Sequence, residues 1–371
     1  MGGVGSGGDR RGRMFRLAGL PAMLGLLAWA GAVVAPSAAA ATPVVTATIP
    51  VGIAPGAVAV NPVTGTVYVA NQGGLFGSRG TVSVISGRTD KVTTTTRVGS
   101  GPRVVAVNPV TGTVYVTNIF SDTVSVISGR TSAVTATIPL GLAPYGVAVN
   151  TATGTVYVAN DGGGTVSVIS GRTGTVTANI PVFFGQHAVA VNPVTGTIYV
   201  TTAFNGTVSV ISGRTDKVTG TIRVGSFPFG VAVSPVTGTV YVTNALSGTV
   251  SVISGRTDKV TGTIHVGSSP RWVAVNPVTG TVYVANALSD TVSVISGRTD
   301  KVTATIPVGV GPFGVAVNPV TGAVYVTNDG SDTVSVVSGP LQNNFLFVNS
   351  GPAITNGHGI LLCSAPGCLT N

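Results

Sequence analysis

Short runs in which apolar and polar residues alternate make up most of the chain. One stretch carries four of them in succession: RWVAVN (271–276), TVYVAN (281–286), TVSVIS (291–296) and KVTATIPV (301–308). Alternation with a period of two is the pattern of a pleated, half-buried β-strand. The linkers NPVTG and SGRTD between these runs consist of turn-forming residues. We therefore expect antiparallel strands joined by hairpin turns.

A four-residue string, Tyr-Val-Ala/Thr-Asn, marks an internal repeat. It starts at Tyr68, Tyr115, Tyr157, Tyr199, Tyr241, Tyr283 and Tyr325. Five of the six spacings are 42 residues and the first is 47, and Thr202 replaces Asn in the fourth copy. Four-stranded units with a period of about 40 to 50 residues are typical of β-propeller blades. Solenoid coils are usually shorter and parallel, so we predict an all-β, seven-bladed β-propeller with four antiparallel strands per blade.

The two ends of the repeat region complement each other. A run of the fourth type, VVTATIPVG, stands alone at 44–52, before the first complete unit. The seventh copy breaks off after TVSVVSG (333–339) and so lacks its fourth strand. An unpaired edge strand would promote aggregation. We predict that the N-terminal strand enters the last blade and closes the ring.

The Tyr-Val-Thr-Asn strings also give the chain a family resemblance. With their period and copy number, they resemble the YVTN-repeat β-propellers, a family of microbial surface-layer and exported proteins. The resemblance covers residues 44–339 and implies the propeller fold. It implies no particular activity, because propellers carry many unrelated functions.

Both ends of the chain differ in composition from the repeats. Four arginines between positions 10 and 16 precede the apolar run LAGLPAMLGLLAWAGAVVA, and small residues at 38–41 offer cleavage sites. We expect a signal peptide at 1–41, the propeller at 42–339 and a tail at 340–371. The protein would then be secreted or at the cell surface, with no membrane span after cleavage; an uncleaved anchor is the alternative. Cys363 and Cys368 are candidates for a small disulfide loop in the tail.

Composition narrows the chemistry. Only 8% of residues are charged, 44% are hydrophobic, and all ten acidic residues are Asp. Glu is a good helix former and a frequent general base, so its absence predicts few helices and few catalytic carboxylates. The net charge of +9, part of which belongs to the leader, is mild for this length and predicts no nucleic-acid partner. We expect a monomer without a cofactor.

The copies are nearly identical at the turns NPVTGT and SGRTDKV, which in a propeller lie on one face, hereafter the constant face. The other two connections lie on the opposite side, the loop face, and there the copies diverge. Candidates for binding a protein or a cell-wall polysaccharide on the loop face are Arg103, Tyr145, His187, Phe229, Arg271, Trp272 and Phe313. Exposed aromatic residues and arginines are typical of interfaces. Packing inside the central channel is the structural alternative.

The constant face carries a repeated basic residue. It recurs at Arg88, Arg130, Arg172, Arg214, Arg256 and Arg298, with Asp90, Asp216, Asp258 and Asp300 close by. A basic ring would suit an anionic polymer. Charges of alternating sign favour a solvated rim of weak salt bridges, which is the interpretation that we prefer.

His187 is the one histidine on the loop face and the candidate general base there. It lies in the copy that reads FFGQHA and lacks the proline of the other loops. An exported lyase or hydrolase centred near His187 is the alternative function. With no Glu and no second ligand beside it, we expect neither a catalytic constellation nor a metal site. The preferred hypothesis is a non-enzymatic binding and scaffold protein.

Overall fold

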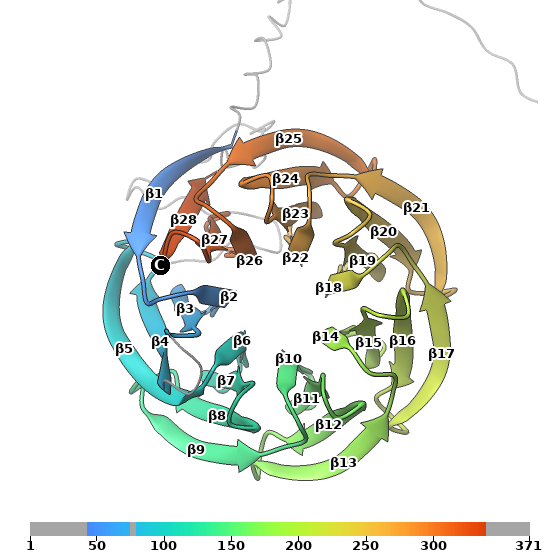
Figure 1. Cartoon of the computed structure of the whole chain (residues 1–371), viewed down its shortest axis with the longest axis horizontal. Coiled ribbons are helices and arrows are strands. Elements are labelled where there is room, and N and C mark those ends of the chain that lie inside the picture. Colours follow the sequence, from blue (N-terminus) through green and yellow to red (C-terminus); the bar gives the residue numbers. More distant parts are fainter. Residues whose placement is uncertain (1–42, 75–78, 339–371) are drawn as a thin grey trace, which may run out of the picture. The chain divides into compact units, whose positions relative to one another are not determined.

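The computed structural model describes residues 43–74 and 79–338. They form seven four-stranded antiparallel sheets, which stand around a central axis as the blades of a propeller (Figure 1). The predicted fold class is confirmed. Within these residues no helix has the length and apolar character needed to cross a bilayer. The expected signal peptide, the tail, Cys363 and Cys368 lie outside the described residues.

Each blade runs from an innermost strand at the axis to an outermost strand at the rim (Figure 1). Blades 1 and 2 contain β2 (Pro55–Val60), β3 (Thr66–Asn71), β4 (Arg79–Ser86), β5 (Lys91–Ser100), and β6 (Pro102–Val107), β7 (Thr113–Asn118), β8 (Thr123–Ser128), β9 (Val134–Pro139). Blades 3 and 4 contain β10 (Pro144–Val149), β11 (Thr155–Asn160), β12 (Thr165–Ser170), β13 (Thr175–Pro181), and β14 (Gln186–Val191), β15 (Thr197–Thr202), β16 (Thr207–Ser212), β17 (Lys217–Arg223). Blades 5 and 6 contain β18 (Pro228–Val233), β19 (Thr239–Asn244), β20 (Thr249–Ser254), β21 (Lys259–His265), and β22 (Pro270–Val275), β23 (Thr281–Asn286), β24 (Thr291–Ser296), β25 (Lys301–Pro307). Blade 7 contains β26 (Pro312–Val317), β27 (Val324–Asn328), β28 (Thr333–Ser338) and β1 (Val44–Pro50).

The ring closes as the sequence predicts, with the first strand in the last blade. Strand β1 pairs antiparallel with β28, from Val44 opposite Ser338 to Pro50 opposite Thr333. Ile49 of β1 is buried against this blade, with 4% of its surface exposed. The closure leaves no unpaired third strand in blade 7, which removes an edge that would promote aggregation.

Burial follows the position of a strand within its blade. The second strands, such as β11, are buried over nearly their whole length, because a neighbouring blade covers each side. The outermost strands, such as β25, expose most of their residues to solvent. Apolar clusters join adjacent blades; one packs Tyr241 and Val250 of blade 5 against Val282 of blade 6. Because neighbouring blades cover both sides of these inner strands, most of their positions take apolar residues such as valine and few take a charged residue.

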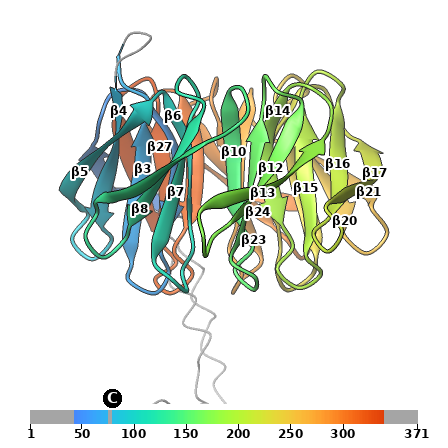
Figure 2. The same cartoon turned by 90° about the horizontal axis from the view of Figure 1, so that it is seen from below.

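The connections lie on two opposite faces, which are seen edge-on in Figure 2. On the constant face, the N–H of Gly87 in the SGRTD turn donates to the carbonyl of Gly65 in the NPVTG turn at 3.1 Å. On the loop face, the N–H of Ile119 donates to the carbonyl of Gly101 at 2.9 Å, which joins the two variable connections. The predicted assignment of turns to faces is therefore confirmed.

Local chemistry explains why the NPVTG turns repeat. In the first copy, the Oδ1 atom of Asn61 accepts a hydrogen bond from the N–H of Val63 at 3.0 Å. Gly65 closes the turn with a φ of +70°, a conformation that favours glycine. A first residue without a side-chain acceptor, or a last residue other than glycine, would weaken this turn.

The aspartates of the constant face join blades to one another. The hydroxyl of Tyr199 in blade 4 donates to Asp258 of blade 5 at 3.1 Å, and Tyr325 of blade 7 reaches Asp90 of blade 1 at 3.5 Å. Burial, together with the charge of Asp258, raises the pKa of Tyr199. The described residues contain no salt bridge between these aspartates and the repeated arginines. The expected salt-bridged rim is therefore replaced by tyrosine–aspartate contacts that the sequence analysis missed.

Candidate functional site

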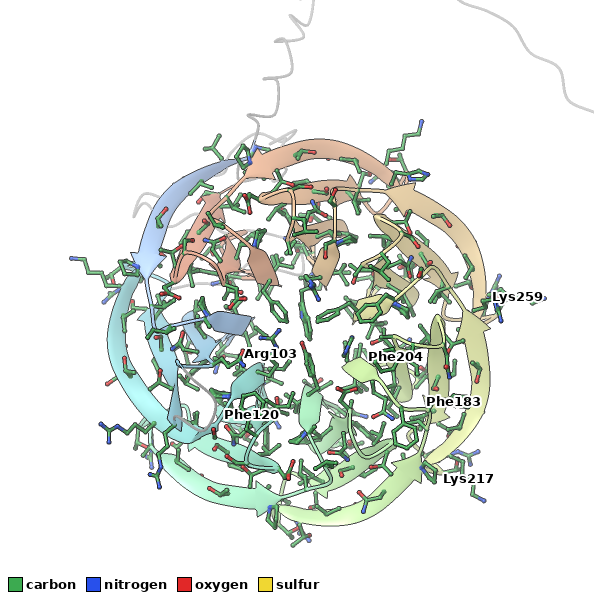
Figure 3. All side chains as sticks on the ribbon, viewed as in Figure 1. Arg103, Phe120, Phe183, Phe204, Lys217 and Lys259 are labelled. Carbon is green, nitrogen blue, oxygen red and sulfur yellow. The ribbon has the colours of Figure 1, made fainter. Side chains whose placement is uncertain are left out.

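Side chains at one repeated position meet on the propeller axis. The position is the second residue of each innermost strand, and around the ring it is occupied by Gly56, Arg103, Tyr145, His187, Phe229, Arg271 and Phe313. The ring of Phe229 in blade 5 contacts Tyr145 of blade 3 and Phe313 of blade 7, with centroids 5.9 and 5.6 Å away. Because those blades are two places away on either side, the side chains must reach the axis. Figure 3 shows Arg103 close to the centre of the ring.

The aromatic members of this group pack around Phe229. Its ring centroid lies 4.5 Å from that of His187 and 6.3 Å from that of Trp272. Trp272, the residue after Arg271, stacks on Phe313 with an interplanar angle of 28°. We call Arg103, Tyr145, His187, Phe229, Arg271, Trp272 and Phe313 the axial cluster. The structure thus brings together all seven residues that the sequence analysis selected.

The expectation that the aromatic residues of the cluster are exposed is wrong for three of them. Tyr145, Phe229 and Phe313 expose 7%, 2% and 4% of their surfaces. They fill the loop-face end of the channel, because rings from opposite blades reach one another across the axis. Arg103, Arg271 and Trp272 are half-buried, so they are the members of the cluster that solvent reaches. A role in binding stays a prediction.

Arg103 spans the gap left by the smallest residue of the ring. Blade 1 has Gly56 at the repeated position, and the guanidinium of Arg103 extends across it to lie 4.1 Å from the ring centroid of Phe313. The Nε atom of Arg103 donates to the hydroxyl of Tyr145 and its Nη1 atom donates to Oε1 of Gln72, both at 2.9 Å. Two hydrogen bonds and a cation–π contact hold this side chain in place. Sequence reasoning missed Gln72 as a partner.

Arg271 is held much more loosely. Its guanidinium lies 4.9 Å from the ring centroid of Phe229. Within the part of the chain that the structure describes, its side chain has no hydrogen-bond acceptor and no salt bridge. Burial lowers the pKa of Arg271, and the nearby charge of Arg103 acts in the same direction. Asp329 is the carboxylate whose charge favours the protonated form of Arg271, although the two do not form a salt bridge.

His187 is a buried, neutral imidazole. Its ring lies 5.1 Å from Tyr145 and 5.4 Å from Phe227, and 8% of its surface is exposed. Burial, with the charges of Arg271 and Arg103, lowers the pKa of His187 to about 4. Its Nδ1 atom is buried without a hydrogen-bond partner among the described residues. An imidazole in this state is uncharged at neutral pH and has no carboxylate to orient it.

Large apolar side chains surround the axial cluster on the loop face. We call them the apolar rim: Ile53, Phe120, Leu142, Phe183, Phe184, Phe204, Leu246, Leu288 and Val310, which expose 44–80% of their surfaces. Figure 3 shows Phe120, Phe183 and Phe204 lying farther from the axis than Arg103. Exposed apolar groups that recur around one surface mark it as a candidate for interaction. None of these residues is among the candidates that the sequence analysis selected.

Blade 4 departs from the other six blades at one contact. In blade 5, the loop residue Gly225 packs directly against the strand residue Asn244. A Cβ added to Gly225 would lie 2.6 Å from the Cγ of Asn244, so an asparagine at this strand position requires a glycine in the loop. Blade 4 replaces this pair with Phe183 and Thr202. The Nδ2 atom of Asn244 donates to Thr249 and Ser251, whereas the Oγ1 atom of Thr202 is buried with no partner in the described residues.

A surface pocket of about 260 Å³ opens between blades 4 and 5. It is lined by residues 203–206, after β15, and by 223–227, between β17 and β18. Phe204 and Phe227 form its aromatic corner, with ring centroids 6.0 Å apart. Phe227 also contacts His187, so its side chain connects the lining of the pocket with the axial cluster.

Comparison with known proteins agrees with this fold. One family model matches residues 230–330, from β18 to the end of β27. The chain is similar to YNCE-like β-propellers. No curated protein sequence matches it.

The propeller also resembles many solved structures. Among the 1443 matching chains is Kuenenia stuttgartiensis hydrazine synthase, with a TM-score of 0.68 and 22% identity over 76% of this chain and 95% of that chain. Identity at this level shows a shared fold alone. A fold found in so many chains does not select a function, which must be argued from the site.

The loop face combines cationic and aromatic side chains with exposed apolar ones. Across residues 43–74 and 79–338, no three His, Cys, Asp or Glu side chains come together as metal ligands. The axial cluster supplies two guanidinium groups beside aromatic rings, and the apolar rim supplies contact area around them. Aromatic residues and arginine are the residue types that carry most binding energy in interfaces.

Proposed function

We propose that the chain is an exported, non-enzymatic binding and scaffold propeller whose loop face contacts a protein or a polysaccharide. The observation that carries this proposal is the variation at a single repeated position. Seven nearly identical units place Gly56, Arg103, Tyr145, His187, Phe229, Arg271 and Phe313 there. A fold that needs only a packed axis has no need of two arginines at this position. Variation that is greatest on one surface supports recognition at that surface.

The path of the chain also supports a contact surface on the loop face. Val44 and Ser338 pair with each other at the end of blade 7 that carries the constant face. The first and last strands of the described chain therefore have these ends on the side opposite the loop face. An attachment made at either residue would be made away from the proposed contact surface.

The alternative of a lyase or hydrolase receives less support from the geometry. A general base needs a pKa near the working pH and a group that orients it. The pKa of His187 is lowered to about 4, and no described carboxylate hydrogen-bonds to its ring. Hydrolysis of a polysaccharide panel that disappears in the His187→Ala variant would favour the alternative.

The test uses two equally exposed positions of one blade that lie on opposite faces. Leu288, on the loop face, exposes 80% of its surface, and Val278, on the constant face, exposes 74%. A photo-crosslinking amino acid is placed at each position in the full chain, and each variant is mixed with secreted proteins and wall fragments of the host. We expect Leu288 variants to form a saturable adduct of defined mass, and Val278 variants to form none.

The proposal fails if both positions give the same adducts or if neither gives one. A companion variant, Leu246→Ser with the crosslinker kept at position 288, should weaken capture while leaving the melting temperature within about 2 °C, because the side chain of Leu246 is exposed. Trp272 is a poor choice for this purpose. It stacks on Phe313, so removing it would change both folding and binding.

A further inference from the structure

Two arginines approach the axis of the loop face without an anion to neutralise them. Arg103 and Arg271 occupy the same repeated position in blades 2 and 6, and each guanidinium lies against the face of an aromatic ring. The charge of Arg103 acts on the pKa of Arg271, so the two groups are near enough to repel each other. In the described part of the chain, neither forms a salt bridge. Two half-buried cations in this arrangement repel each other and lose part of their hydration, both of which cost free energy.

Several hydrogen-bond donors of the axial cluster have no acceptor among the described residues. Arg103 uses Nε for Tyr145 and Nη1 for Gln72, which leaves its Nη2 group without a described acceptor. The guanidinium of Arg271 has no described acceptor at all. The hydroxyl of Tyr145 accepts from Arg103, so its own hydrogen is available to a further acceptor. These donors belong to side chains of one cluster, in which solvent reaches Arg103 and Arg271.

The surroundings favour a negative group over a neutral one. Tyr145, Phe229 and Phe313 exclude water from one side of the arginines, which strengthens Coulomb attraction. Asp329 interacts electrostatically with both arginines; burial raises its own pKa, and the charge of Asp332 acts in the same direction. Asp329 forms a salt bridge with neither guanidinium, so both cationic groups remain available to an external anion. His187, which faces the same cluster, is neutral and adds no charge of its own.

We propose that the loop face recognises an oxyanion, a carboxylate, phosphate or sulfate group, which binds between Arg103 and Arg271 on the propeller axis. The inference rests on the proposed function, since it states the chemistry that the partner presents. Guanidinium groups match the planar or tetrahedral oxygens of these anions and bind them in a forked geometry. Trp272, half-buried beside Arg271, supplies an aromatic face for the ring or chain that carries the anion.

The test compares matched ligands and matched variants of the full chain. Glucuronate and glucose share a sugar ring but differ in the carboxylate; inorganic phosphate, sulfate and acetate are compared with chloride at equal ionic strength. Binding is measured by calorimetry and by the shift in melting temperature. We expect saturable binding of glucuronate or of one inorganic oxyanion, and none of glucose or chloride. The oxyanion that binds most tightly identifies the source of the negative group.

Arg271→Gln is the decisive variant, because the side chain has no hydrogen bond in the described chain to lose on substitution. We expect oxyanion affinity to fall roughly 10- to 100-fold. Arg271→Lys should recover part of the loss, since it restores the charge without the fork. Arg298→Gln, in the same blade but on the constant face, should bind as the wild type does. It also corrects for the general stabilising effect of sulfate and phosphate.

The outcomes separate this inference from the proposed function. Oxyanion binding that depends on Arg271 supports the inference even if a crosslinker at Leu288 captures nothing, and the scaffold function then fails alone. Partner capture at Leu288 without Arg271-dependent oxyanion binding overturns the inference and leaves the function standing. Equal oxyanion affinity in the wild type and in Arg271→Gln also overturns it.

Discussion

The two faces of this propeller are built from the same repeat, but their residues have different roles. On the constant face, the repeated side chains serve the structure, since Asn61 caps a turn and Asp258 accepts from a tyrosine of the preceding blade. On the loop face, the second residue of the innermost strand ranges from Gly56 to Phe313 with no change of backbone pairing. Repetition therefore marks what the fold requires, and divergence marks the positions that the fold leaves free to vary.

Removing the closing strand β1 would disrupt the last blade, which contributes to both faces, and should have the largest effect on stability. A chain without residues 42–52 loses the pairing of β1 with β28 and the burial of Ile49. About six ladder hydrogen bonds, each worth about 1 kcal/mol net, are lost. We expect aggregation in size-exclusion chromatography and a melting temperature lower by about 10 °C or more.

A peptide of residues 42–52, added in trans, should raise the melting temperature of the truncated chain, and a scrambled peptide should not. A truncated chain that is monomeric and melts at the wild-type temperature would contradict the closure seen in the structure.

Acid should destabilise the loop-face end of the axis through His187. Its pKa in the folded chain is lowered to about 4 from an ordinary value of 6.5. Between these values the unfolded chain binds the proton and the folded chain does not. Stability is therefore complete above about pH 6.5 and falls as the pH drops towards 4, by roughly 3 kcal/mol in all.

The His187→Phe variant isolates this effect. Phenylalanine suits a site between Phe227 and Phe229 and carries no titrating group. Asp161 and Asp329, whose pKa values burial raises, favour the folded state as the pH falls and are present in both chains. The difference in unfolding free energy between wild type and variant should therefore change with pH from 6.5 to 4. A constant difference would show that His187 is charged, or solvated, in the folded chain.

The fold could be predicted from the sequence because the residues of each blade specify its own strands and turns. Period-two alternation, NPVTG turns and a lone strand at 44–52 define strands, hairpins and closure without long-range information. The candidate site could be read only in part. Divergent loops located the axial cluster, but the path of Arg103 over Gly56 to Phe313 depends on a residue missing from another blade. Burial of Tyr145 and Phe229 likewise follows from contacts between blades that no single repeat contains.

On the constant face, removing one interblade hydrogen bond should have a smaller effect. Tyr199→Phe removes the hydroxyl that donates to Asp258 at 3.1 Å and leaves the ring in place. We expect a loss of about 1–2 kcal/mol in chemical denaturation, because the acceptor is charged and the donor is partly buried. Tyr115→Phe is the matched control. The turn beside it has Gly174 where four other copies have Asp, and the hydroxyl of Tyr115 makes no hydrogen bond to a described residue. Equal losses in the two variants would refute a specific role for the aspartates.

The smallest effect tests why blade 4 differs from its neighbours on the loop face. Phe183→Gly with Thr202→Asn rebuilds the glycine–asparagine pair of the other blades and gives Thr207 a donor that it lacks among the described residues. Thr202→Asn alone should destabilise, because a Cβ at this loop position crowds the asparagine. Phe183→Gly alone leaves Thr202 without a partner and adds backbone freedom. We expect the double variant to be more stable than the sum of the single variants by about 1 kcal/mol, measured as a double-mutant cycle. Additive effects would mean that the two substitutions in blade 4 are independent, and that its departure from the repeat has no shared structural cause.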